Sequence, residues 1–200
     1  MAKGIMKAIR NRIDKMEEGS IFFTSDFNDI ASLTTVRKCL SRIYEEGTIR
    51  RLFDGMYDKP RYSKLLKETA PPDIEKVSEA LAEKYNWTIA PDGNISLNLL
   101  GLSTQVPMHY SYISDGPYRE FMINDIEITF KHRANKNITN LSKPTIMVIE
   151  ALRVLGKKRV NEDTVAILKN NLPNKEKKNI LKEAEGCTRW IYNVIRRVCA

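Results

Sequence analysis

The chain is poor in the residues that build disulfide scaffolds, metal sites and acid–base active sites. It has three cysteines, Cys39, Cys187 and Cys199, and two histidines, His109 and His132. An odd number of cysteines, with no CxxC pair and no Cys/His ligand set, argues against a disulfide framework and against a zinc site. The sequence therefore predicts a reduced, cytoplasmic protein that needs no metal and no cofactor.

Long apolar runs are also missing. No stretch approaches the ~18 consecutive apolar residues that a membrane-spanning helix needs. Met1 to Gly4 lead into an amphipathic segment, not into the apolar core of a signal peptide. We therefore expect no signal peptide and no membrane partner. Hydrophobic residues still make up 42% of the chain, which is enough for a packed core.

The motifs that mark common enzyme sites are absent as well. The sequence contains no P-loop, no GxGxxG, no HExxH and no GxSxG. Both histidines fall in or next to expected strands, where a structural role is more common than catalysis, and no carboxylate pair has a catalytic spacing. The protein is predicted not to be an enzyme, and a nucleic-acid enzyme with an unfamiliar site is kept as an alternative.

What the chain has in excess is positive charge. It carries 33 Lys+Arg against 25 Asp+Glu, a formal net charge of +8. Residues 1–70 hold 14 of the basic and 10 of the acidic residues, so this part is the more basic per residue. A basic balance favours nucleic acid or another anionic partner. The alternative is an ordinary basic protein whose charges only face water.

Hydrophobic periodicity divides the first part of the chain into short elements. Apolar residues recur at helical spacing over 5–16 and 34–46, whereas 21–23 and 48–57 have the pattern of a strand and a glycine-containing hairpin. Thr24, Ser25 and Asp26 offer N-caps for a short helix through Ile30. The order helix, strand, helix, helix, hairpin predicts a winged helix-turn-helix over residues 1–62.

The helix predicted over 34–46 has two chemically different faces. Val36, Cys39, Leu40 and Ile43 form an apolar stripe, and hydroxyls and cations lie opposite. A helix that enters the major groove of DNA needs a core stripe and short polar or basic side chains. The residues predicted to contact DNA, from this helix, the hairpin and the segment after it, are Thr34, Thr35, Arg37, Lys38, Ser41, Arg42, Arg50, Arg51 and Arg61.

The predicted contacts divide into base readout and phosphate binding. The helix residues are expected to read bases or nearby phosphates, with hydroxyls at the helix start bonding phosphates beside free backbone N–H groups. Arg50 and Arg51 on the hairpin are expected to bind the flanking backbone, and Arg61 to add a phosphate. Two alternatives stay open: a solvated helix face, and a winged helix that binds a partner protein.

The rest of the chain is predicted to be a linker, 63–72, and a mixed α/β domain, 73–200, so that the fold class is α+β. The linker is polar and ends in Pro71-Pro72. Three strands separated by turn residues are expected to form a small antiparallel meander, over 108–113, 118–123 and 126–131. A further short strand is expected over 87–90, and helices over 74–85, 95–100, 142–155, 163–170, 175–185 and 188–198.

Two features near the C-terminus have open interpretations. Basic clusters at 157–159 and 175–178 are either a second nucleic-acid surface, for tRNA or flanking DNA, or solvated helix ends. The last helix carries a broad apolar stripe that includes Trp190, for which core packing is favoured over a partner groove.

The segment from Leu40 to Tyr57, LSRIYEEGTIRRLFDGMY, resembles the N-terminal winged helix of AbiEi-type antitoxins from bacterial abortive-infection toxin–antitoxin systems. The shared elements are a helix, then Gly-x-Ile-x-Arg-Leu, then Gly-x-Tyr. A second block, Ala90 to Gly93 and Leu97 to Pro107, is also similar to that family. The resemblance covers roughly residues 5–135, and the chain is shorter than many such antitoxins.

The resemblance implies a transcriptional autoregulator encoded beside a nucleotidyltransferase-like toxin. In that family the winged helix represses the operon by binding operator DNA. The larger C-terminal domain neutralises the toxin, without necessarily forming a stable complex with it. Because one winged helix covers a short site, repeated half-sites and more than one copy on DNA are expected.

Overall fold

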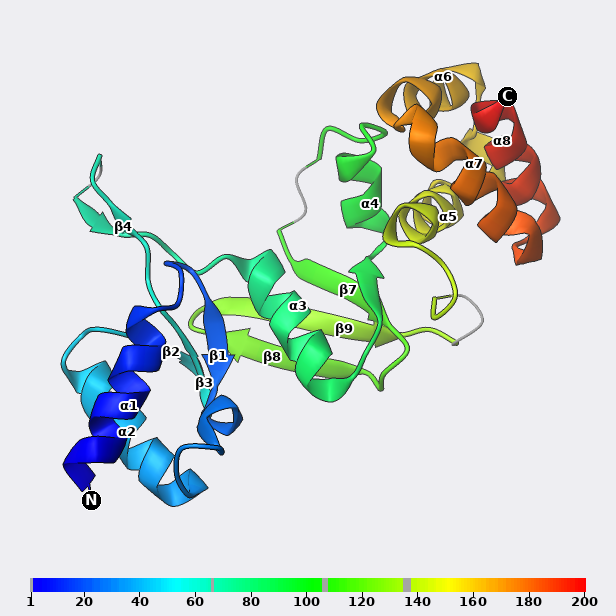
Figure 1. The fold of residues 1–200 in the computed structure, drawn as a ribbon. Helices are drawn as coiled ribbons and strands as arrows, with labels where there is room; N and C mark the ends of the chain where they lie inside the picture. Colours follow the sequence, from blue (N-terminus) through cyan, green and yellow to red (C-terminus); the bar gives the residue numbers. More distant parts are fainter. Residues whose placement is uncertain (1, 66, 106–107, 135–137) are drawn as a thin grey trace. The chain divides into compact units, whose positions relative to one another are not determined.

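The computed structural model describes residues 2–65, 67–105, 108–134 and 138–200. The fold is α+β, with small sheets and a group of C-terminal helices (Figure 1). Two compact units are present: Met1–Leu81 with Met122–Asp125, and Ala82–Phe121 with Ile126–Ala200. Leu66 of the predicted linker, and Val106 and Pro107 at the end of the second family-like block, lie outside the described residues.

The first unit begins with two helices and a three-stranded antiparallel sheet. The sheet has the strand order β1-β3-β2. The elements are α1 (Ala2–Asp14), β1 (Ile21–Phe23), the 3₁₀ helix η1 (Thr24–Phe27), α2 (Leu33–Glu45), β2 (Arg50–Phe53) and β3 (Met56–Asp58). The helix, strand and hairpin positions agree with the expectation from periodicity to within a few residues.

The core of the first unit is made by one stripe from each helix and by aromatic side chains of the sheet. Ile9 and Ile13 of α1 and Leu40 and Ile43 of α2 are fully buried. Phe22 of β1 packs edge-on against Phe27 and lies parallel to the ring of Tyr57. Each such aliphatic side chain contributes about 1.5–3 kcal/mol by leaving water. This burial sets which side of α2 faces outward.

The predicted short helix through Ile30 is only a single 3₁₀ turn. Asp26 accepts a hydrogen bond from the backbone N–H of Phe23 at 2.8 Å, which closes the turn at its start. Asn28 N–H bonds Ser25 C=O at 3.1 Å, the i→i+3 pattern of a 3₁₀ helix. The N-cap residue is Phe23, so the expectation of a cap at Thr24, Ser25 or Asp26 was wrong; Asp26 lies inside the turn and bonds back to the backbone of Phe23. The segment has too few apolar side chains to sustain a longer helix by burial.

The predicted linker is not irregular throughout. β4 (Tyr62–Ser63) and β5 (Glu68–Thr69) pair as a short antiparallel hairpin within or beside 63–72. Backbone pairing needs no buried side chains, so a polar composition did not reveal it. α3 (Ile74–Tyr85) follows with the bounds expected from its periodicity.

The second sheet has the strand order β6-β7-β9-β8, and the predicted antiparallel meander is wrong. The strands are β6 (Ile89–Pro91), β7 (Tyr110–Ser114), β8 (Arg119–Ile123) and β9 (Ile126–His132). β9 lies between β7 and β8 and runs parallel to β7, with Ser111 opposite Thr129 (Figure 1). Turn residues after β7 show that the chain reverses, but they do not say which strand becomes the neighbour.

Aromatic packing explains why β9 is central. Phe130 of β9 is fully buried, and its ring lies 5.6 Å from that of Trp87, 5.8 Å from that of Tyr112 and 5.8 Å from that of Phe121. Gly116 lets the β7–β8 connection cross the indole, because a Cβ there would come within 2.4 Å of the Trp87 ring. In its central position, β9 places Phe130 among aromatic rings from β7, β8 and the segment before β6.

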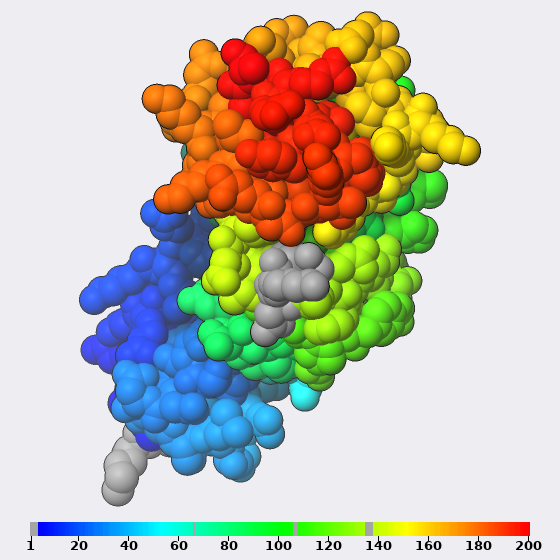
Figure 2. Space-filling view, turned by 90° about the vertical axis from the view of Figure 1, so that its right-hand side faces the viewer, coloured from blue at the N-terminus to red at the C-terminus, as the bar shows by residue number. Residues whose placement is uncertain are grey.

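The C-terminal helices share one apolar core within the second unit. Val148, Leu152, Leu168, Ile180 and Ile195 are among its buried side chains. In Figure 2, α7 (orange) and α8 (red) lie side by side, in agreement with their contacts. The elements are α4 (Gly93–Leu99), α5 (Lys143–Leu155), η3 (Lys157–Arg159), α6 (Glu162–Asn171), α7 (Asn174–Glu183), η4 (Ala184–Gly186) and α8 (Arg189–Cys199). None of the helices in the described part of the chain has the length and apolarity to cross a bilayer.

A carboxylate from α7 caps the start of α5. Ser142 occupies the N-cap position, as expected, but its side chain does not cap the helix. Glu183 Oε2 instead accepts hydrogen bonds from Ser142 N–H at 2.9 Å, from Ser142 Oγ at 2.7 Å and from Thr145 Oγ1 at 2.5 Å. Partial burial raises the pKa of Glu183, but these bonds outweigh it and hold the pKa below its ordinary value of 4.5.

The low pKa of Glu183 predicts a pH-dependent stability. A carboxylate with a depressed folded-state pKa stabilises the fold above its ordinary pKa and loses this effect as the pH falls through the folded-state value. We expect Glu183→Gln to lower the free energy of unfolding at pH 7, and the difference from wild type to shrink below about pH 4.5. Urea unfolding of both proteins at pH 7 and at acid pH measures this.

Glu185→Gln is the matched control, because Glu185 is exposed on η4. It should leave the urea midpoint nearly unchanged at both pH values. A Glu183→Gln penalty that is the same at pH 7 and at acid pH would contradict the carboxylate's role.

Candidate nucleic-acid interface

The outward side of α2 carries polar and basic side chains. Val36, Cys39, Leu40 and Ile43 are buried, and the helix turn places the other side of α2 in water. We call the exposed set the α2 face; its members are Thr34, Arg37, Lys38, Ser41 and Arg42. Thr35, also predicted to contact DNA, is half-buried, and its hydroxyl bonds that of Ser32 at 3.0 Å. It therefore helps to shape the helix start.

The cations of the α2 face are not used by the fold. Among the residues that the structure describes, the side chains of Arg37, Lys38 and Arg42 make no hydrogen bond and no ion pair. Ser41 donates to Glu45 at 3.3 Å, within the same helix. Charged groups that are exposed and unpaired keep their full capacity to bind an external anion.

Arg51 lies on β2, in the hairpin that follows α2 along the chain. Its guanidinium pairs with Asp54 at 2.7 Å, and both side chains are at least half exposed. Burial raises the pKa of the Tyr57 phenol, while the positive charges of Arg51 and Arg37 act to lower that pKa. Because both cations influence one hydroxyl, the α2 face and the hairpin bring positive charge to the same region.

Arg50 has a different environment from its neighbour Arg51. Its Nε and Nη2 bond the two carboxylate oxygens of Asp58 at 3.0 and 2.6 Å, and its Nη1 bonds Ala70 C=O at 2.9 Å. Asp58 is only 2% exposed. Most guanidinium donors of Arg50 are therefore engaged inside the protein, which argues against the predicted phosphate contact.

Arg61 is exposed but stands apart from the hairpin turn. It follows the end of β3 that is opposite to the turn at Asp54-Gly55. Its stem lies over Gly19, where a Cβ would come within 3.4 Å of Arg61 Cδ. Arg61 therefore lies away from the turn where Arg51 pairs with Asp54, whereas Arg51 and Arg37 both act electrostatically on Tyr57.

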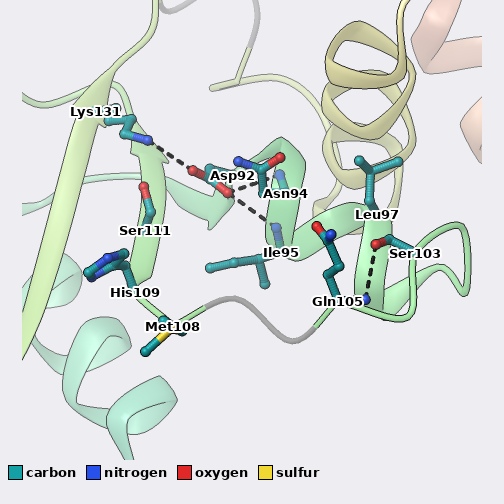
Figure 3. Close-up of a pocket in the computed structure, with 10 residues that line it drawn as sticks. All are labelled: Asp92, Asn94, Ile95, Leu97, Ser103, Gln105, Met108, His109, Ser111 and Lys131. Carbon is teal, nitrogen blue, oxygen red and sulfur yellow. Dashed lines mark hydrogen bonds and ion pairs between the residues drawn. The ribbon is translucent and has the colours of Figure 1, made fainter.

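The second unit contains a cavity of about 420 Å³ that the sequence did not predict (Figure 3). Asp92 Oδ1 caps α4 by accepting the N–H groups of Asn94 and Ile95 at 3.1 and 3.2 Å, and its Oδ2 binds Lys131 Nζ at 3.0 Å. Ser111 Oγ is buried and has no hydrogen-bond partner in the described residues.

The cavity is lined by both polar and apolar side chains, and the charges of Asp92 and Lys131 pair with each other. The segment Pro91 to Asn94 was expected to be a turn and helix cap, and Asp92 is the N-cap of α4. Nothing in its spacing linked it to Lys131, which lies 39 residues later. Ile95, Leu97 and Met108 supply apolar wall, and His109 and Gln105 supply polar groups. Within the described ranges, no cluster of three His, Cys, Asp or Glu side chains has a geometry suited to a metal ion.

Comparison with known proteins assigns the chain to a family but not to an activity. The model of the family described as "Family of unknown function (DUF6088)" matches residues 8–180, so the chain belongs to that family. No curated protein matches the chain.

The two hairpin arginines should differ in their effect on stability. Arg50→Ala leaves the buried Asp58 carboxylate without its partner, which costs about 3–5 kcal/mol. Arg51→Ala removes an exposed pair worth about 0–1 kcal/mol. Thermal or urea unfolding of the two single variants measures this difference. Equal stability of the two variants would show that the Arg50–Asp58 pair does not hold the hairpin in place.

Proposed function

We propose that the first unit is a winged helix-turn-helix that binds duplex DNA, and that the protein is a DNA-binding transcriptional regulator. The observation that carries this proposal is the α2 face: three cations without internal partners on one helix, with Arg51 of the hairpin adding charge nearby. The element order helix, strand, short helix, helix, hairpin supports the same reading.

In this proposal α2 is the recognition helix. Its 13 residues span about 20 Å, and its outer side is free to enter a major groove about 12 Å wide. Arg37 and Lys38 would reach guanine edges or nearby phosphates. Thr34, at the helix start, would bond a phosphate together with backbone N–H groups of the first turn.

The hairpin would act as the wing through Arg51 and not through Arg50. An exposed ion pair contributes little to stability, so Arg51 can exchange Asp54 for a DNA phosphate at small cost. Arg50 would have to leave the buried Asp58, which costs several kcal/mol. The role of Arg50 is therefore to hold the wing in position.

We further propose that the regulator acts as the antitoxin of an AbiEi-like system. Support comes from the resemblance of Leu40 to Tyr57 and of the block that begins at Ala90 to those antitoxins. The DNA site would be the operator of its own operon, bound by more than one copy, and the functional partner would be a nucleotidyltransferase-like toxin. The proposed mechanism is non-catalytic.

Removing two cations of the α2 face should weaken DNA binding. We expect Arg37→Ala with Lys38→Ala to raise the Kd for the protein's own upstream DNA by about tenfold or more, since one good base contact is worth about 1–3 kcal/mol. The slope of log K against log salt should flatten by about one for each lost phosphate contact. Mobility-shift titrations at several salt concentrations measure both effects.

Lys7→Ala with Lys15→Ala is the matched control, because it removes the same charge from exposed positions on and just after α1. It should change the Kd much less. Equal weakening by both double variants, or no preference for upstream DNA over random duplex, would contradict the proposal. Wild-type protein that ignores DNA but co-elutes with the neighbouring gene product would identify a protein-binding winged helix.

The antitoxin role has its own test. We expect the adjacent gene product to arrest growth when it is expressed alone, and growth to recover when the full chain is expressed with it. Recovery should persist with the Arg37→Ala, Lys38→Ala chain, because neutralisation is assigned to the second unit. A harmless neighbour, or arrest that the chain does not relieve, would overturn the antitoxin role and leave DNA binding untouched.

A further inference from the structure

Positive charge is concentrated at two ends of the chain, and the C-terminal one is not explained by the proposed function. Residues 157–200 hold 11 Lys+Arg and 5 Asp+Glu, whereas residues 71–156 hold 8 and 10. The helical end therefore has a net charge of +6 next to a stretch of net charge −2. A local excess of this size is the electrostatic mark of a surface that binds a polyanion.

The charge surrounds a hollow of about 520 Å³ between η3 and the start of α8. We call it the α8 hollow; its lining residues are Lys157, Val160, Thr188, Arg189, Trp190, Asn193, Val194 and Arg197. Three of these side chains are cationic and none is acidic. In Figure 2, α8 is red and the chain near residue 160 is yellow.

The cations of the hollow are largely free. Within the described part of the chain, the side chains of Lys157 and Arg189 have no hydrogen bond and no ion pair. Arg197 pairs with Glu162, whose side chain is 85% exposed, so that pair is weak and exchangeable. Among the described residues, Glu162 is thus the one acidic partner of the cations that line this hollow.

Trp190 places an aromatic ring among these cations. It is half-buried, packs against the helical core and still lines the hollow beside Arg189 and Arg197. Aromatic rings next to a cationic groove bind unpaired bases by stacking, worth about 1–3 kcal/mol for each base, while the cations bind the phosphates. In a duplex the bases are already stacked on each other, so no base face is available to stack on an indole ring.

We propose that the α8 hollow binds single-stranded nucleic acid, with one base stacked on Trp190 and the flanking phosphates held by Lys157 and Arg189. Val160 and Val194 supply the apolar wall that a base needs, and Thr188 and Asn193 supply polar groups for the sugar edge. This site is separate from the α2 face, because all its residues belong to the second unit.

The contribution of the two cations to single-strand binding is tested with the full chain. Fluorescence anisotropy of labelled eight-nucleotide RNA and DNA strands gives a Kd for wild type and for Lys157→Ala with Arg189→Ala. We expect this variant to raise the Kd about tenfold, since phosphate contacts dominate such affinities. Lys175→Ala with Lys178→Ala is the matched control, because it removes two exposed charges of α7 that do not line the hollow.

The control should raise the Kd by less than about threefold, as expected for a loss of general attraction only. Equal weakening by the two variants would mean a diffuse basic surface and would overturn the site. A clear preference of one strand type over the other identifies the natural ligand as RNA or DNA, and either result supports the single-strand site.

Stacking on Trp190 is tested without changing the protein. An abasic DNA strand of equal length keeps the phosphates and lacks the bases, so its Kd should rise at least about fivefold if a base is stacked. Binding of abasic and normal strands with equal affinity would overturn the role of Trp190. Competition by an equal-length duplex as strong as by the single strand would overturn the single-strand preference.

The outcome is distinguishable from that for the proposed function. Arg37→Ala with Lys38→Ala should leave single-strand binding unchanged, and Lys157→Ala with Arg189→Ala should leave the preference for upstream duplex DNA unchanged. Loss of single-strand binding in the α2-face variant would show that the hollow is not the site.

Discussion

Burial of the apolar stripe of α2 is the interaction on which the first unit depends. Leu40 and Ile43 pack with Ile9 and Ile13 of α1 over the aromatic side chains of the sheet. A helix that buries one stripe this fully has no rotational freedom, so its opposite side chains must face water. The positions of the α2-face cations therefore follow from core packing. Because Arg37, Lys38 and Arg42 have no partner within the described ranges, that surface is available to a polyanion.

The hairpin shows how one dipeptide serves two purposes. Successive residues of a strand point to opposite faces, so Arg50 and Arg51 meet different surroundings although they are chemically identical. Arg50 lies opposite Asp58 in the strand register and is drawn into a buried pair. Arg51 points to the other side and pairs only with the exposed Asp54. The first arginine stabilises the hairpin, and the second remains able to exchange its partner.

In the second unit, some charged side chains are paired with each other or bonded within the fold, and others are not. Asp92 and Lys131 neutralise each other at the cavity beside α4. Glu183 accepts hydrogen bonds at the start of α5 and so caps that helix. The α8 hollow differs because Lys157 and Arg189 have no acidic partner among the residues that the structure describes. The paired side chains serve the stability of the fold. The unpaired cations remain able to bind an external anion.

Local periodicity in the sequence was enough to determine the α+β class, the helix bounds such as Ile74–Tyr85, and the polar face of α2. These features depend on residues three to four or two apart, which a sequence displays directly. Tertiary structure alone decided that β9 pairs with β7. It also decided that Arg50 bonds Asp58 and Ala70 inside the protein, and that Lys157 and Trp190 line the same hollow. Each of these depends on which distant segments become neighbours, and that is set by the burial of side chains such as Phe130 within a whole core.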